Sequence, residues 1–178
     1  SLIVGALLVL AYDLIRGRQH TLAERRTAAL CIGATALIAA ILDSVSLGAL
    51  GPIYGHNFIL DHLALATRTG VLGLALLTLG VTAGAKLLRH PAEYVAIILF
   101  ATAGFTLMAA AHHLLVAFVA LELASLSLYV LAGFDKDQRT SAEAALKYFL
   151  FGGMATAFLL FGFSLIYGVT GALEFSRI

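Results

Sequence analysis

The sequence predicts an all-α fold, a polytopic transmembrane helix bundle of about six helices. Hydrophobic residues make up 61% of the 178-residue chain and charged residues only 12%, roughly half the charged fraction of an average soluble domain. The apolar residues gather in runs close to the roughly 20 residues that a helix needs to cross about 30 Å of hydrocarbon. Most Lys and Arg residues fall in the short segments between these runs. Together these three features predict a membrane protein.

The apolar runs divide the chain into six expected helices. No segment between them is rich in Pro or Ser, and no polar stretch is long enough for a soluble domain, so residues 1–178 are expected to form a single transmembrane bundle. The chain starts with Ser inside an apolar run, and we expect it to be a fragment of a longer protein. The expected helices span 1–16, 28–49, 61–85, 92–111, 114–134 and 141–170.

Charges and small residues delimit the first three helices. Basic residues from Arg16 onward follow the first apolar run rather than precede it, which favours a transmembrane helix cut short over a signal peptide. The second run ends before Gly51, and the third begins at Asp61, where an acidic residue interacts favourably with the helix dipole. Within the third helix, Gly80-xxx-Gly84 matches the close-packing motif of membrane helices, although a Gly-rich chain also produces this spacing by chance.

The last three helices follow a proline, a histidine pair and a capping motif. The fourth run starts after Pro91, and His112 with His113 forms the corner between the fourth and fifth helices. The segment from Thr140 to Glu143 fits a capping box, with Thr140 as N-cap and Glu143 at the third helical position. The motif predicts that the sixth helix starts directly after that cap.

Lys and Arg are distributed unevenly between the two sides of the expected bundle. One side collects eight of them, whereas the other side has only Arg177; Arg68 and Lys147 fall within helices. Because basic residues favour the cytoplasmic side of a membrane, we expect the first side to be cytoplasmic, with the segments Arg18–Arg26, Lys86–Arg89 and Asp135–Arg139. The eight residues are Arg16, Arg18, Arg25, Arg26, Lys86, Arg89, Lys136 and Arg139.

Glu122 is the first candidate site residue, because it lies near the middle of the expected helix 114–134. An ionisable group at mid-helix costs at least about 2.5–3.5 kcal/mol, so such a residue usually faces a cavity or a partner. Ser125 and Tyr129 follow at helical spacings and form a polar stripe with it. We interpret Glu122 as a proton-handling group. The alternative is a protonated glutamate that only holds helices together by hydrogen bonds.

Lys147 is the second candidate, in the second turn of the expected sixth helix. Counted from the same membrane face at 1.5 Å per residue, it lies roughly 9–10 Å deep and Glu122 about 18 Å deep, which gives an axial offset of about 8 Å. Long side chains and one or two waters would bridge that gap. The alternative is a lysine that reaches back to the cytoplasmic surface.

The rest of the sequence gives no sign of nucleic-acid binding, metal binding or nucleophilic catalysis. The net charge of +1 gives no reason to expect nucleic acid as a partner, and the lone Cys31 allows no disulfide. No Cys/His metal spacing, glycine-rich phosphate loop or nucleophile constellation is present. The roles of Arg68, His112 and His113 stay open. An acid and a base inside membrane helices therefore indicate ion or proton movement.

Residues 110–175 resemble the antiporter-like membrane subunits of respiratory complex I. The stretch Leu121–Leu131, which contains Leu-Glu-Leu-Ala-Ser-Leu, is similar to the fifth transmembrane helix of these subunits. Two stretches are similar to subunit N in particular. They are Ser141–Leu150, which contains the motif Leu-Lys-Tyr-Phe-Leu, and Tyr167–Gly171. Over the rest of the chain the similarity is one of topology.

The resemblance implies a proton-translocating membrane subunit of a bacterial NADH:quinone oxidoreductase, which is a translocase. Glu122 falls on the buried glutamate of the fifth helix and Lys147 on the lysine of the sixth helix in the same polar axis; the seventh-helix lysine of the family lies beyond Ile178. The implied partners are the other membrane-arm subunits of the complex and the lipid bilayer of the bacterial inner membrane. The resemblance implies no cofactor in this chain, because NAD, FMN, iron–sulfur clusters and quinone belong to other subunits.

Two other functions stay open on the sequence. A subunit of a multisubunit sodium/proton antiporter shares the same helix motifs. A non-transporting membrane scaffold would hold its neighbours by its glycine-rich faces, and it would work unchanged after Glu122→Gln.

Overall fold

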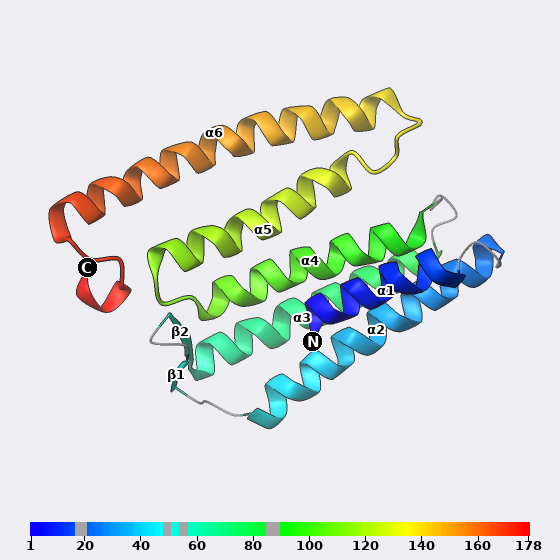
Figure 1. Cartoon of the computed structure of the whole chain (residues 1–178), viewed down its shortest axis with the longest axis horizontal. Helices are drawn as coiled ribbons and strands as arrows, with labels where there is room; N and C mark the ends of the chain where they lie inside the picture. The colour runs from blue at the N-terminus through cyan, green and yellow to red at the C-terminus, as the bar shows by residue number, and fades with distance from the viewer. Residues whose placement is uncertain (17–20, 48–50, 54–56, 85–89) are drawn as a thin grey trace.

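The computed structural model describes residues 1–16, 21–47, 51–53, 57–84 and 90–178. Six α-helices dominate the described chain (Figure 1), which confirms the predicted all-α bundle. The basic residues Arg18, Lys86 and Arg89 lie outside the described ranges. The helices are α1 Leu2–Arg16, α2 Leu22–Leu47, α3 His62–Gly84, α4 Pro91–Ala110, α5 Leu114–Ala132 and α6 Arg139–Thr170, with two strands, β1 Gly51–Ile53 and β2 Phe58–Leu60, and a 3₁₀ turn at Phe175–Arg177.

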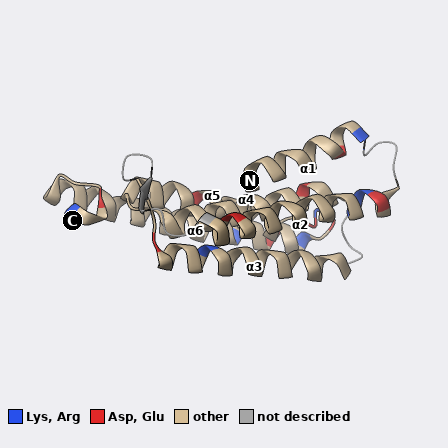
Figure 2. Cartoon of the chain, turned by 90° about the horizontal axis from the view of Figure 1, so that it is seen from below, with Lys and Arg blue, Asp and Glu red and all other residues tan. Residues whose placement is uncertain are grey.

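The helices have the length and polarity of membrane spans. Five of those described, α2 to α6, are long and apolar enough to cross a membrane. α1 has 15 residues, about 22 Å at 1.5 Å per residue. Few charged residues interrupt the helices along their length (Figure 2). The composition-based prediction of a membrane bundle therefore holds for five of the six described helices.

α4 lies at the centre of the bundle and α6 at its edge. α4 packs against α1, α2, α3 and α5, whereas α6 packs against α5. In the most apolar stretch of each helix, 56% of the α4 residues are buried but none of the α6 residues. The core is thus formed mainly by the first four helices, and its most deeply buried side chains include Val9, Leu37, Leu72, Val95 and Leu99.

Gly104 allows α4 and α5 to approach closely. A Cβ atom at this position would lie 2.6 Å from the backbone nitrogen of Ala124 and 2.8 Å from the carbonyl oxygen of Ala120. A Cβ atom at Gly80 or Gly84 would meet no atom within 4 Å. The motif singled out in the sequence therefore packs against nothing in the described chain, and a different glycine makes the close helix contact.

α2 begins at Leu22 rather than at residue 28, because a capping box forms ahead of the apolar run. The Thr21 backbone N–H donates to a carboxylate oxygen of Glu24 at 2.9 Å, and the Glu24 N–H donates to Thr21 Oγ1 at 3.4 Å. These reciprocal bonds satisfy amide groups that the first turn leaves free. The first turns of α2 are consequently polar, and its apolar part starts only afterwards.

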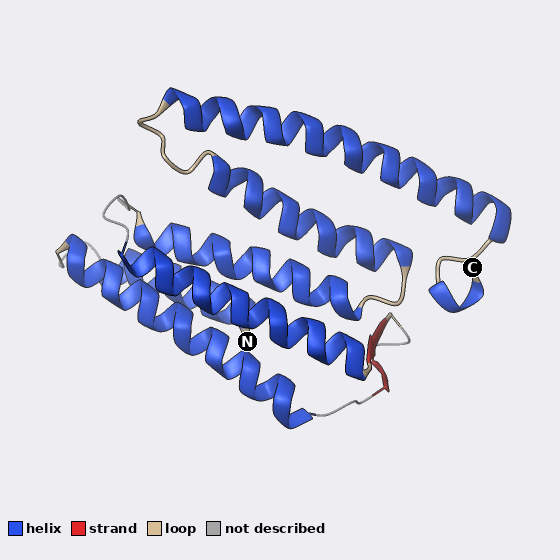
Figure 3. Ribbon diagram, turned by 180° about the vertical axis from the view of Figure 1, so that it is seen from behind, coloured by secondary structure: helices blue, strands red, loops and turns tan. Residues whose placement is uncertain are grey.

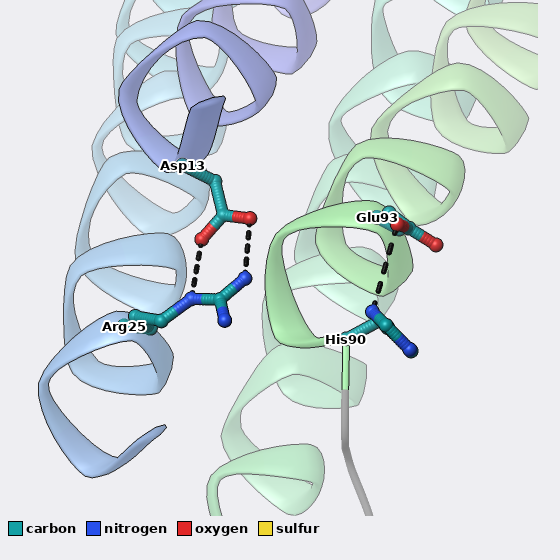
Figure 4. A network of polar contacts seen from close by, with 4 residues as sticks. All are labelled: Asp13, Arg25, His90 and Glu93. Carbon is teal, nitrogen blue, oxygen red and sulfur yellow. Dashed lines mark hydrogen bonds and ion pairs between the residues drawn. The ribbon is translucent and has the colours of Figure 1, made fainter. Parts of the chain in front are cut away.

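The ends of α1, α3 and α5 and the starts of α2, α4 and α6 lie at the same end of the bundle (Figure 1). Arg25 of α2 donates two hydrogen bonds to Asp13 of α1, at 2.6 and 2.8 Å (Figure 4). Arg26 donates to the carbonyl oxygens of Thr82 and Ala83 at the end of α3, where a cation is favourable for the helix dipole. We call this the basic end, after Arg16, Arg25, Arg26, Lys136 and Arg139.

α6 begins at Arg139, and the predicted capping box at its start is wrong. Gln138 is the N-cap and makes no side-chain capping bond, so Thr140 is already the second residue of the helix. Glu143 does not turn back to cap the helix. It forms an ion pair with Lys147, with an N–O distance of 2.6 Å. Lys147 lies four residues after Glu143 on the same helix face and so gives the carboxylate a charged partner. The backbone amide of an N-cap residue carries no such charge.

The opposite end carries a small extended element that the sequence did not predict. β1 and β2 pair antiparallel, with Pro52 opposite Ile59, where only a loop was expected. Isolated bridges join Phe58 to Ala111 and His113 to Glu174, so the hairpin, the start of α5 and the C-terminal segment meet here (Figure 3). We call this the hairpin end.

Candidate functional site

Glu122 lies near the middle of α5, as predicted. It follows the first residue of the helix by eight positions and precedes the last by ten, which corresponds to about 12 Å and 15 Å along the axis. Its side chain is half-buried. A glutamate side chain does not span such a distance, so in a membrane the carboxyl group needs partners inside the bundle.

The partner that the structure provides is Thr156 of α6. The Thr156 hydroxyl donates a hydrogen bond to Glu122 Oε1, with an oxygen–oxygen distance of 2.8 Å. Both groups are half-buried, in the contact between two adjacent helices (Figure 1). The hydroxyl therefore gives the Glu122 carboxyl group a hydrogen-bond partner near the middle of the helix.

Tyr129 extends the polar stripe along the same contact. Its side chain is buried, and its ring stands edge-on to Tyr148 at 4.8 Å between centroids and to Phe149 at 5.9 Å. Gly152 provides the space for the Tyr129 hydroxyl, because a Cβ there would overlap with the end of the tyrosine ring. Glu122 and Tyr129 on α5 thus both face α6.

Lys147 lies farther from Glu122 than the sequence predicted. Because Thr156 is opposite Glu122 and Ala145 is opposite Gly133, Lys147 lies nine residues along α6 from the level of Glu122, about 14 Å at 1.5 Å per residue. The predicted offset of about 8 Å is therefore wrong. The cause is that the first turns of α6 project beyond the end of α5, so depths counted from the two helix ends are not comparable.

The partner of Lys147 in the structure is Glu143, one turn earlier on the same helix. The side chains of Lys147 and Glu143 are 66% and 58% exposed. Of the two predicted site residues, the structure places only Glu122 in a helix–helix contact. The sequence did not mark Thr156 as a site residue. Together with Tyr148 and Gly152, Thr156 recurs every four residues along one face of α6.

Four further ionisable residues that the sequence drew attention to lie toward the hairpin end: Asp61, Arg68, His112 and His113. Asp61 caps α3, since its Oδ1 accepts a hydrogen bond from the Ala64 N–H at 2.7 Å. His113 caps α5, and the ring of His112 stands edge-on to Phe175. Arg68 of α3 lines a cavity of about 280 Å³, and its buried Nε has no hydrogen-bond partner in the described chain. Within the described ranges, no group of three His, Cys, Asp or Glu residues could hold a metal ion.

Curated relatives identify the family. Subunit N 2 of NADH-quinone oxidoreductase from Acidobacterium capsulatum is 40% identical, over all of this chain and 38% of the relative. Subunit N from Methylobacterium nodulans is 38% identical, over 99% of this chain and 36% of the relative. The chain belongs to the subunit N family. It spans less than two fifths of the length of these two relatives.

Two further comparisons agree with membership of the subunit N family. The family model described as NADH:quinone oxidoreductase/Mrp antiporter, TM, matches residues 111–178, which include Glu122, Thr156 and Lys147. A chain in the structure of respiratory complex I from Thermus thermophilus with bound aureothin superimposes with a TM-score of 0.79 at 29% identity, over 97% of this chain and 37% of that one. The predicted resemblance is confirmed, and this subunit N chain is part of a multi-pass membrane protein.

Proposed function

We propose that the subunit N protein containing this chain is a proton-translocating subunit of an NADH:quinone oxidoreductase. Electron transfer from NADH to quinone takes place in other subunits, and their rearrangement drives proton movement through this one. In this proposal the chain holds no cofactor, and NAD, FMN, iron–sulfur clusters and quinone serve its partners. The names of the relatives and the fold shared with a complex I chain support the proposal.

The observation that carries the proposal is the position of Glu122. It is an acid in the middle of an apolar helix, hydrogen-bonded to Thr156 of the neighbouring helix at 2.8 Å. Burial, nearby charges and hydrogen bonds each favour one form of a carboxyl group, protonated or ionised. In this proposal Glu122 receives the proton, and Lys147 acts nearer the basic end of the same path.

The proposed setting is the inner membrane of a bacterium, with the basic end in the cytoplasm. The other membrane-arm subunits of the oxidoreductase and the lipid bilayer are the proposed partners. The outward side chains of α6 support such surroundings, since Phe151, Phe158 and Phe161 are exposed in the isolated chain. Apolar side chains of this size are stable against lipid or another membrane helix.

A second candidate is a subunit of a sodium/proton antiporter. The matching family model names both NADH:quinone oxidoreductase and Mrp antiporter, and its matched residues contain the candidate site. A scaffold without transport is the third candidate. It predicts no function for the hydrogen-bonded carboxyl group of Glu122.

Transport by the complete complex in sealed vesicles separates the first two candidates. With the proposed function, oxidation of NADH by quinone acidifies the vesicle lumen in sodium-free buffer, and a protonophore abolishes the acidification. Sodium/proton exchange driven by an imposed pH gradient, without NADH, would instead establish the antiporter.

A further inference from the structure

The hydroxyl of Thr156 departs from the usual hydrogen bonding of helical hydroxyls in this protein. A threonine or serine inside a helix commonly donates to the carbonyl oxygen four residues earlier. Thr69, Thr78, Thr82, Thr102 and Ser127 all do so, at 2.7–2.9 Å. The equivalent carbonyl for Thr156 belongs to Gly152, on its own helix. Thr156 donates instead to Glu122 across the helix contact.

We propose that Thr156 is a positioning residue for Glu122, which holds the carboxyl group in the α5–α6 contact in the orientation used for proton transfer. The inference rests on the proposed function, because it assigns a role to the partner of the proposed proton carrier. The hydroxyl has an alternative acceptor one turn away, so its bond to Glu122 reflects a favourable interaction with the carboxyl group.

The helices packed against α5 provide no competing charge at this level. α4 has no ionisable residue between Tyr94 and its end at Ala110, and α6 has none between Tyr148 and Tyr167. The nearest charged pair on α6 is Lys147 with Glu143. Lys147 lies about 14 Å along the helix axis from the level of Glu122. In the described chain the Thr156 hydroxyl is therefore the polar group that fixes the direction of the Glu122 side chain.

The register of the two helices determines where that hydroxyl lies. Tyr129 fits over Gly152, and its ring contacts Tyr148 edge-on. Thr156 follows Gly152 by four residues and so lies on the same face of α6. The aromatic contact at Tyr129 thus sets the level at which the hydroxyl meets Glu122.

The test compares Thr156→Val with Thr156→Ser in the complete complex. Valine keeps the shape of threonine but removes the hydroxyl, whereas serine keeps the hydroxyl. Since a typical hydrogen bond changes a conformer ratio on the order of several-fold, Thr156→Val is expected to reduce the number of protons pumped per electron several-fold. Thr156→Ser should retain most of the pumping. The matched control is Thr102→Val, because the Thr102 hydroxyl bonds to its own helix at 2.7 Å.

Two readouts separate positioning from a merely structural role. In the Glu122→Gln background, adding Thr156→Val should cause no further loss of pumping. In infrared difference spectra, the carboxyl band that disappears in Glu122→Gln should shift in Thr156→Val and stay in place in Thr102→Val. The amount of assembled complex is measured for every variant, and Thr156→Ala replaces Thr156→Val if valine lowers it.

The outcomes distinguish the inference from the function on which it rests. Reduced pumping in Glu122→Gln together with normal pumping and an unshifted band in Thr156→Val would overturn the inference alone. An equal loss from Thr156→Val with and without Glu122→Gln would also overturn it, because the hydroxyl would then act elsewhere. Normal pumping in Glu122→Gln would overturn both.

Discussion

At the residue scale, the two predicted site residues have unlike surroundings. Glu122 is hydrogen-bonded between two helices, whereas Lys147 is two-thirds exposed and paired with Glu143 on its own helix. The ion pair joins two residues one turn apart on the same helix, so it does not connect Lys147 to another helix. A contribution of Lys147 to transport therefore depends on the lysine itself rather than on its ion pair.

Substitution of Lys147 tests whether this lysine must lose its proton. Lys147→Ala is expected to lower proton pumping while the amount of assembled complex stays normal. Lys147→Arg should lower it as well, because an arginine stays charged at any relevant pH. Pumping is measured per electron transferred, with Glu143→Gln as the control that removes only the ion pair. Full pumping in Lys147→Arg would show that a fixed positive charge suffices.

The sequence revealed Glu122 but not Thr156, for a physical reason. An acid inside an apolar run is visible in a single sequence because its burial is costly. A threonine in a helix is unremarkable, since it usually bonds to its own backbone. The hydrogen-bond partner of Thr156 depends on the register between α5 and α6, which a single sequence does not reveal. The axial offset between Lys147 and Glu122 was predicted wrongly for the same reason.

At the element scale, apolar runs predicted the helices better than capping and glycine motifs predicted their details. All six helices were found because a membrane span needs a long apolar stretch. The start of α2 was missed because Thr21 and Glu24 cap it before that stretch begins. The three-residue strands of the hairpin are too short to show a periodic pattern. Gly104 makes the close contact with α5, yet no GxxxG spacing marks it.

Gly104→Ala tests the close contact between α4 and α5. The added methyl group would lie against the α5 backbone, so the helices must separate, at a cost of about 1–3 kcal/mol. Gly80→Ala is the matched control, because a Cβ there meets no atom within 4 Å and alanine favours a helix more than glycine does. The midpoint of thermal unfolding in detergent should fall only for Gly104→Ala. If Gly104→Ala and Gly80→Ala unfolded at the same midpoint temperature, the close contact at Gly104 would not be needed for the packing of α4 against α5.

At the scale of the whole molecule, the basic end gives the bundle a direction. The ion pair between Asp13 and Arg25 and the bonds of Arg26 to the end of α3 gather at this end. Moving these groups across the bilayer would cost several kcal/mol for each charge. The fold and the charge distribution therefore predict one orientation, with the hairpin end outside.

Cysteine labelling in intact cells tests this orientation. Cys31 is free and exposed, so it is first replaced by serine. Asn57→Cys at the hairpin end is expected to react with a membrane-impermeant thiol reagent added outside, and Gln138→Cys at the basic end is expected to react only after the cells are opened. Both positions are exposed, so access depends on the side of the membrane. The reverse pattern would invert the orientation.

The central claim is that the proton passes through the carboxyl group of Glu122. Glutamine keeps the size of the side chain and can still accept the hydrogen bond from Thr156, but it cannot ionise. The most direct measurement is the number of protons pumped per electron by the complete complex carrying Glu122→Gln in sealed vesicles, normalised to complex content. The account predicts a clear loss of pumping with normal assembly, and a smaller loss in Glu122→Asp. An unchanged proton-to-electron ratio in Glu122→Gln would contradict it and leave the carboxyl group with a structural role only.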